Sequence, residues 1–164
     1  MALQLRSDNF NDGDSLDIEQ VVSEDAGFGC AGGNISPALG WSDAPADTKS
    51  FAITCFDPDA PTGCGFWHWV VVNIPADATS LPAGAGSGDG LPAGALQLRN
   101  DYSTRAYGGP CPPEGDDAHH YEFTVYAVGL DGLPVNADTS CAVVGFFLNF
   151  NTLEKATLTG VYKR

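Results

Sequence analysis

The stretch FDPDAPTGCGFWHWVVVNIP, residues 56–75, places an aspartate–proline turn directly before an apolar segment. The segment carries aromatic and β-branched residues at successive positions, which is typical of a strand that is buried on both faces. One histidine, His68, lies in the middle of this strand. A buried polar group without a partner costs roughly 1–3 kcal/mol, so we expect a polar partner beside His68.

Other segments predict further strands. KSFAITCFDP (49–58) precedes the His68 strand and HHYEFTVYAVGL (119–130) follows it, while LQLRSDNF (3–10), LDIEQVV (16–22) and LTGVYKR (158–164) predict shorter ones. Asn151 and Glu154 stand three residues apart, which predicts a capped helix over Leu153 to Thr157. The Gly, Ala and Ser stretch 83–94 predicts a flexible surface excursion. Together with twenty glycines and eleven prolines, these patterns predict one mainly β domain over residues 1–164.

The chain is strongly acidic, with a net charge of −14 and only seven Lys and Arg residues. Phosphate backbones need clustered cations, so we expect no nucleic acid partner. Anionic membrane surfaces should repel the protein, and no apolar run reaches the length of a membrane span. We therefore expect no stable membrane insertion, and we interpret the acidity as a property of an acidic or salt-adapted proteome.

The five cysteines are odd in number, widely spread and without a CxxC pair; they are Cys30, Cys55, Cys64, Cys111 and Cys141. The first thirty residues do not resemble a signal peptide. In a chain without an export signal, reduced thiols are the default state. The sequence therefore predicts five reduced thiols and a cytoplasmic protein.

Alternation along residues 119–128 separates the histidines. His119 and Tyr121 share the apolar face of this strand, whereas His120 lies on the mixed face and should point into solvent. The DPDAP turn should fold into a hairpin that brings Asp57 close to His68. A carboxylate there would satisfy the imidazole and raise its pKa. The alternative is that Asp57 and Asp59 only cap the turn, which suits Asp59 better.

The segment YGGPCPPEG (107–115) precedes the His119 strand. Glycines 108 and 109 have no Cβ, so their backbone N–H groups can approach a ligand closely, and Pro110 stiffens the chain after them. Such a loop alone indicates a stiff turn. Together with two inward histidines and a tyrosine, it predicts a small preformed pocket with donors for an anion.

Three motifs together resemble the phosphatidylethanolamine-binding protein family in its bacterial and archaeal branch, described as Raf kinase inhibitor-like. They are GGNISPALGW (32–41), DPDAPTGCGFWHWVVVNIP (57–75), and YGGPCPPEG (107–115) with HHYEFTVYAV (119–128). The resemblance runs from about Cys30 to Arg164. It implies a β-sandwich of two packed antiparallel sheets with a few short helices. It also implies a small surface pocket for phosphate-type headgroups, acetate and similar anions. The residues that it assigns to ligand binding are Asp57, His68, Gly109, Pro110, His119 and Tyr121.

Three positions depart from the family pattern. His120 stands where an arginine is usual, Asn151 where a histidine often precedes Thr-Leu, and Ser103 where glycine is common. None of them is an assigned pocket residue, so the departures leave the rim and the ligand preference open.

The sequence thus predicts a non-catalytic binding or regulatory protein without a cofactor. Its ligand would be a small anion or phosphorylated headgroup, and the resemblance extends this to a kinase or other protein partner and to a homodimer. A hydrolase using Asp57, His68 and His119 is the alternative, although no serine or cysteine stands in a nucleophile elbow. A zinc enzyme with Cys64 added to the two histidines lacks the close-spaced ligand pairs of structural zinc.

Overall fold

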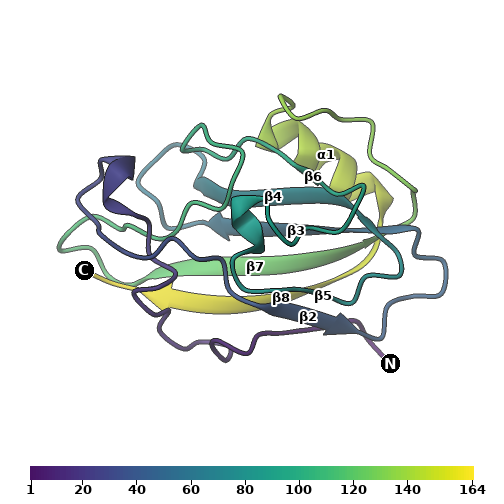
Figure 1. Cartoon of the computed structure of the whole chain (residues 1–164), viewed down its shortest axis with the longest axis horizontal. Helices are drawn as coiled ribbons and strands as arrows, with labels where there is room; N and C mark the ends of the chain where they lie inside the picture. The colour runs from purple at the N-terminus through teal and green to yellow at the C-terminus, as the bar shows by residue number, and fades with distance from the viewer.

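A computed structural model describes all residues 1–164 and shows two antiparallel sheets (Figure 1). In spatial order the five-stranded sheet contains β6 (Leu96–Gln97), β4 (Phe66–Pro75), β3 (Ser50–Asp57), β7 (His119–Val128) and β8 (Thr152–Tyr162). The three-stranded sheet contains β1 (Gln4–Arg6), β2 (Leu39–Ser42) and β5 (Ser80–Leu81). The helices are the short η1 (Glu24–Ala26) and η2 (Ala85–Ser87) and the longer α1 (Cys141–Asn151). The predicted mainly β fold with two sheets and a few helices is confirmed.

The central strands β3, β4 and β7 of the large sheet are buried on both faces. One face packs against the small sheet in a core that includes Trp41, Ile53 and Phe123. The other face packs against α1, where Val70 and Leu148 belong to one apolar cluster. Because both faces of β4 lose contact with water, its sequence is apolar at nearly every position instead of alternating.

The helix predicted over Leu153 to Thr157 is wrong. The helix spans Cys141–Asn151 instead, and the Ser140 hydroxyl caps it by accepting a hydrogen bond from the Val143 amide at 3.3 Å. Asn151 ends the helix, and residues 152–162 pair with β7 along its whole length. The hydrogen bonds of a full strand ladder thus outweigh a local capping signal. At eleven residues α1 is the longest helix, and no helix combines the length and apolarity needed to cross a bilayer.

Two other segments also differ from the sequence prediction. Residues 16–22 form turns rather than a strand, with only one bridge just before them, between Ser15 and Val161. The stretch 83–94 contains η2, in which Ala85 and Gly86 are fully buried. The Gly86 amide donates to the Ser36 hydroxyl at 2.9 Å, so the segment is anchored to the loop before β2.

The prediction of five reduced thiols is also wrong. Cys30 and Cys111 form a disulfide across 81 residues of sequence, whereas Cys55 and Cys141 are buried free thiols and Cys64 is an exposed one. No short motif announces this pair, because the fold itself brings the two loops together. Structural disulfides are typical of oxidising compartments, so one support for a cytoplasmic location is lost and the location stays a prediction.

We expect three reactive thiols per unfolded chain under non-reducing conditions, and five after reduction. A loop of this length should stabilise the fold by roughly 4 kcal/mol, so the double variant Cys30→Ser/Cys111→Ser should lower the free energy of unfolding by about that amount. Thiol titration and urea denaturation measure the two effects. Cys64→Ser is the control and should leave stability unchanged, while five reactive thiols without reductant would contradict the pairing.

Candidate functional site

A cavity of about 180 Å³ opens where β3 ends and where β4 and β7 begin. Its walls combine aromatic, proline and polar side chains from these strands and from the flanking loops. The lining residues are Phe28, Asp57, Ala60, Pro61, Thr62, Phe66, His68, Tyr102, Cys111, Pro112, Pro113, His119 and Tyr121. Four of the six predicted site residues are therefore at the cavity, and Gly109 and Pro110 are not.

A β-bulge places His68 at the cavity. Cys55 pairs with Trp69 and Phe56 with Trp67, so His68 has no partner residue on β3. The extra residue reverses the alternation of β4: the Trp67 ring packs in the cluster beside α1, while the His68 ring lies 5.2 Å from that of Tyr121. Backbone hydrogen bonds brace the bulge from the loop that follows β6, where the Gly108 amide donates to the His68 carbonyl at 3.0 Å.

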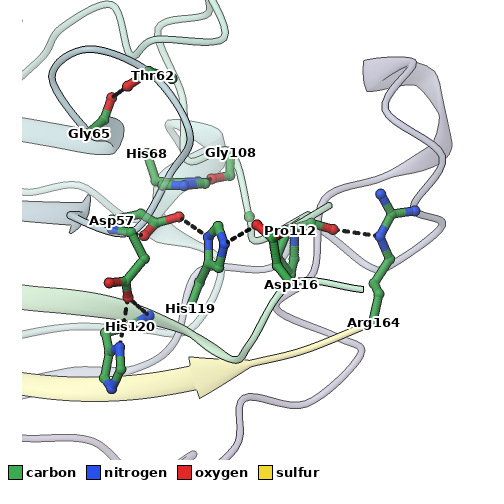
Figure 2. A network of polar contacts seen from close by, with 12 residues as sticks. Asp57, Thr62, Gly65, His68, Gly108, Pro112, Asp116, His119, His120 and Arg164 are labelled. Carbon is green, nitrogen blue, oxygen red and sulfur yellow. Dashed lines mark hydrogen bonds and ion pairs between the residues drawn. The ribbon is translucent and has the colours of Figure 1, made fainter. Parts of the chain in front are cut away.

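The partner of His68 is a backbone carbonyl and not Asp57. The Nδ1–H group of His68 donates a hydrogen bond to the Gly108 carbonyl at 2.6 Å (Figure 2). Burial lowers the pKa of His68 to about 4, although the carbonyl and Asp57 favour the protonated form. His68 is therefore neutral near pH 7, and its Nε2, for which the chain supplies no donor, is a free acceptor. The prediction that Asp57 charges His68 is wrong.

Asp57 pairs with His119 instead. The His119 ring stands between two carboxylates, donating from Nδ1 to Asp57 at 2.7 Å and from Nε2 to Asp116 at 2.9 Å (Figure 2). Both Asp57 and His119 have side chains only 4% exposed. Burial disfavours the charged imidazole, but the hydrogen bonds to the two carboxylates outweigh it and raise the pKa of His119. The site thus holds one neutral and one cationic histidine.

Tyrosine hydroxyls complete the polar lining. Burial raises the pKa of both Tyr102 and Tyr121, so each hydroxyl keeps its proton. The Tyr102 hydroxyl donates to the Gly109 carbonyl at 2.8 Å. The Tyr121 hydroxyl has no partner within the chain, although the residue as a whole is only 1% exposed. It is the free donor that matches the free acceptor on His68.

Gly109 and Pro110 serve the wall of the cavity indirectly. The Gly109 amide, which was expected to face a ligand, donates to the Asn34 side chain at 2.8 Å. A Cβ at Gly109 would lie 2.0 Å from the Gln20 carbonyl oxygen, so glycine is needed for close packing there. The Pro110 carbonyl accepts from the Val22 amide at 3.1 Å. This anchoring holds the loop whose next residues, 111–113, line the cavity.

The second aspartate of the turn was also misassigned. Asp57 caps the turn by accepting from the Asp59 amide at 2.8 Å, while Asp59 binds the backbone and ring of His120 at 2.8 and 2.7 Å. His120 is exposed as predicted, with 55% of its side chain accessible.

Asp116 was not identified as a site residue from the sequence. Its position three residues before His119 was the available signal.

The alternative chemistries gain no support. No three His, Cys, Asp or Glu side chains are grouped so that they could hold a metal ion. Cys111, which lines the cavity, is bonded to Cys30 and is not a free nucleophile. That the protein is not an enzyme stays a prediction.

Comparison with known proteins shows the family of the chain. The family model described as "Phosphatidylethanolamine-binding protein" matches residues 6–163. The chain belongs to the phosphatidylethanolamine-binding protein family. The resemblance inferred from the three motifs is therefore confirmed.

Relatives within the family cover nearly the whole chain. The YbcL protein of Escherichia coli is 51% identical over 99% of this chain and 88% of its own length. The YbhB protein of the same organism is 47% identical over 98% of this chain and 99% of its own length. The crystal structure of E. coli YbcL, described as a new member of the mammalian family, matches with a TM-score of 0.95 at 49% identity, over 100% of this chain and 99% of that one.

The two buried histidines predict opposite effects of pH on stability. Unfolded His68 takes up a proton near pH 6.5 and folded His68 only near pH 4, so the unfolded state binds more protons between these values. The free energy of unfolding should therefore fall by about 2 kcal/mol from pH 7 to pH 5 through His68 alone. His119 acts the other way, because its raised pKa gives stability that is present below pH 6.5 and lost as pH rises through the folded pKa.

Urea denaturation at pH 7 and pH 5 measures this difference. His68→Gln keeps a donor for the Gly108 carbonyl but does not titrate, so the fall in stability between the two pH values should shrink by about 2 kcal/mol. His120→Gln, which replaces an exposed histidine, should leave the fall unchanged. An equal fall in the parent and in His68→Gln would show that His68 is not held neutral.

Proposed function

We propose that this protein is a non-catalytic binding protein and that its cavity holds a small phosphate monoester. The observation that carries the proposal is the pair of unpartnered polar groups on the wall, the acceptor Nε2 of His68 and the donor hydroxyl of Tyr121. Neither group has a hydrogen-bond partner in the chain. The two side chains are buried as a whole, but these two atoms are not enclosed, because the enclosed side-chain atoms without a partner are Trp41 Nε1 and Thr152 Oγ1. A ligand that enters the cavity can therefore pair with both groups.

The size of the cavity limits the ligand. At about 180 Å³ it is smaller than the ~300–1,000 Å³ of sites for drug-sized molecules. A phosphate with a short substituent suits this volume, and an acyl chain does not. The rings of Phe66 and Tyr102, whose centroids lie 4.7 Å apart, give the remaining wall an apolar surface for the substituent.

Hydrogen-bond polarity selects a monoester over other anions. The monoanion of a phosphate monoester carries one P–OH donor, which suits the His68 acceptor, and several acceptor oxygens, which suit Tyr121. The imidazolium of His119 lies at the same cavity, where Asp57 and Asp116 accept from its two N–H groups. A phosphodiester or a carboxylate lacks the donor and would leave Nε2 of His68 unpaired. This differs from the sequence hypothesis, in which a protonated His68 donated to the anion.

A protein partner fits the same chemistry. A phosphorylated side chain is itself a phosphate monoester, so regulation of a kinase or of its substrates would proceed by masking such a group. The cytoplasmic location and the homodimer stay predictions, which fractionation and light scattering would test.

The ligand preference can be measured by titration calorimetry at pH 6. Inorganic phosphate and phosphoethanolamine should bind, and the diester glycerophosphoethanolamine should bind about tenfold more weakly, because it cannot donate to His68. The preference for phosphoethanolamine should decline by pH 8, since the second pKa of a phosphate monoester is near 6 and its P–OH donor is then lost, whereas inorganic phosphate keeps a P–OH group. His68, with Asp57 and Asp101 nearest to it, stays neutral over this range. His119, which Asp57 and Asp116 face, has a raised pKa, and loss of its charge at higher pH would weaken the binding of monoester and diester alike. Equal affinity for monoester and diester would contradict the proposal.

The donor role of Tyr121 is tested by Tyr121→Phe, which keeps the ring and removes the hydroxyl. Affinity for inorganic phosphate should fall about tenfold, since a hydrogen bond to a charged ligand is lost. His120→Ala is the matched control, because this exposed residue on the neighbouring position does not line the cavity. A Tyr121→Phe variant with parental affinity would place the phosphate elsewhere.

A further inference from the structure

The two carboxylates on His119 are held in different ways. Asp57 ends strand β3, is buried, and uses its other oxygen to accept the Asp59 amide at 2.8 Å. Asp116 lies on a turn, its side chain is 41% exposed, and its only side-chain contact is the one to His119. Asp57 is therefore fixed by the fold, whereas Asp116 can leave without breaking another side-chain interaction.

The loop that carries Asp116 is anchored at both ends, and between them its other side chains add only an exposed ion pair from Glu114 to Arg164 at 3.8 Å. The Pro112 carbonyl accepts from Nε of Arg164 at 2.7 Å, and the next firm point is His119 in β7 (Figure 2). Between them the backbone has one turn contact, from the Asp116 amide to the Pro113 carbonyl at 3.3 Å. Gly115 has a φ of +89°, a conformation that glycine adopts without strain. Asp116 can thus swing outward while the cavity wall stays in place.

Charge favours exchange over addition at His119. Asp57 already balances the imidazolium, so Asp116 brings the group to a net charge of −1. A further anion beside it would bring a second uncompensated negative charge into a chain whose net charge is −14. If the anion replaces Asp116, the charge around His119 stays the same, and Nε2 keeps a charged acceptor.

We propose that Asp116 occupies the place of a ligand oxygen on His119, and that a phosphate monoester binds by displacing it. The inference rests on the proposed function and adds a residue that determines which anions are accepted. An incoming anion must compete with a tethered carboxylate. A simple carboxylate such as acetate can only accept the hydrogen bond from His119 that Asp116 already accepts. A monoester also pairs with His68 and Tyr121.

The test compares Asp116→Asn with Asp117→Asn. Both substitutions remove one negative charge from the same loop, but Asp117 is exposed and makes no side-chain contact. Asp116→Asn should raise the affinity for inorganic phosphate about tenfold or more, because a neutral amide competes less well for an imidazolium. Asp117→Asn should change it less than twofold. Acetate should bind the parent weakly and gain in Asp116→Asn.

A second readout does not need a ligand. The NMR titration of His119 should show a lower pKa in Asp116→Asn than in the parent, and an unchanged one in Asp117→Asn. Added phosphate should shift the Asp116 amide resonance of the parent. Running phosphoethanolamine beside glycerophosphoethanolamine distinguishes a free monoester from the diester of a lipid headgroup.

The outcomes separate the two proposals. Phosphate that binds parent and Asp116→Asn equally would overturn the exchange and leave the cavity function standing. Binding by Asp116→Asn alone would support the exchange in a strong form. An unchanged His119 pKa in Asp116→Asn would overturn the exchange directly, and no phosphate binding by either protein would overturn both proposals.

Discussion

The short hydrogen bond from Nδ1 of His68 to the Gly108 carbonyl connects the three parts on which the cavity depends. It joins a bulge in β4 to the loop that follows β6, and through that loop to the disulfide at Cys111. It also fixes the tautomer, because a carbonyl can only accept, and so the other ring nitrogen must face outward without a proton. One contact therefore decides both where the ring points and what chemistry it offers.

Burial then gives the two histidines different charge states within one cavity. His68 meets a neutral dipole, so the cost of desolvation keeps it uncharged. His119 contacts two carboxylates, and their hydrogen bonds and charges outweigh desolvation and raise its pKa. A site with one neutral acceptor and one cation distinguishes ligands by where their proton lies, whereas two imidazolium rings would attract any anion. In a chain with a net charge of −14, that selectivity does not depend on attraction at long range.

The fold could be predicted from the sequence to the extent that it depends on local patterns. The apolar runs identified β3, β4 and β7, and alternation correctly separated His119 and Tyr121 from His120. The pairing of Asp57 with His68 failed because strict alternation does not anticipate a bulge, and the bulge turns His68 toward a carbonyl from a distant loop. Pairs that only tertiary structure creates leave no local trace in sequence.

The disulfide and the C-terminus show the same limit. Cys30 and Cys111 lie 81 residues apart, and two residues before Cys111 the 20–34 segment packs against Gly109 so closely that a Cβ would not fit. Arg164 then adds a contact to the Pro112 carbonyl from the far end of the chain. Both contacts hold residues 111–112 at the cavity wall, and the turn with Asp116 is joined to Arg164 only through the exposed pair with Glu114 at 3.8 Å. A rigid wall beside a displaceable carboxylate can exchange one anion for another without reshaping the cavity, so the loop combines a fixed binding geometry with one movable charge.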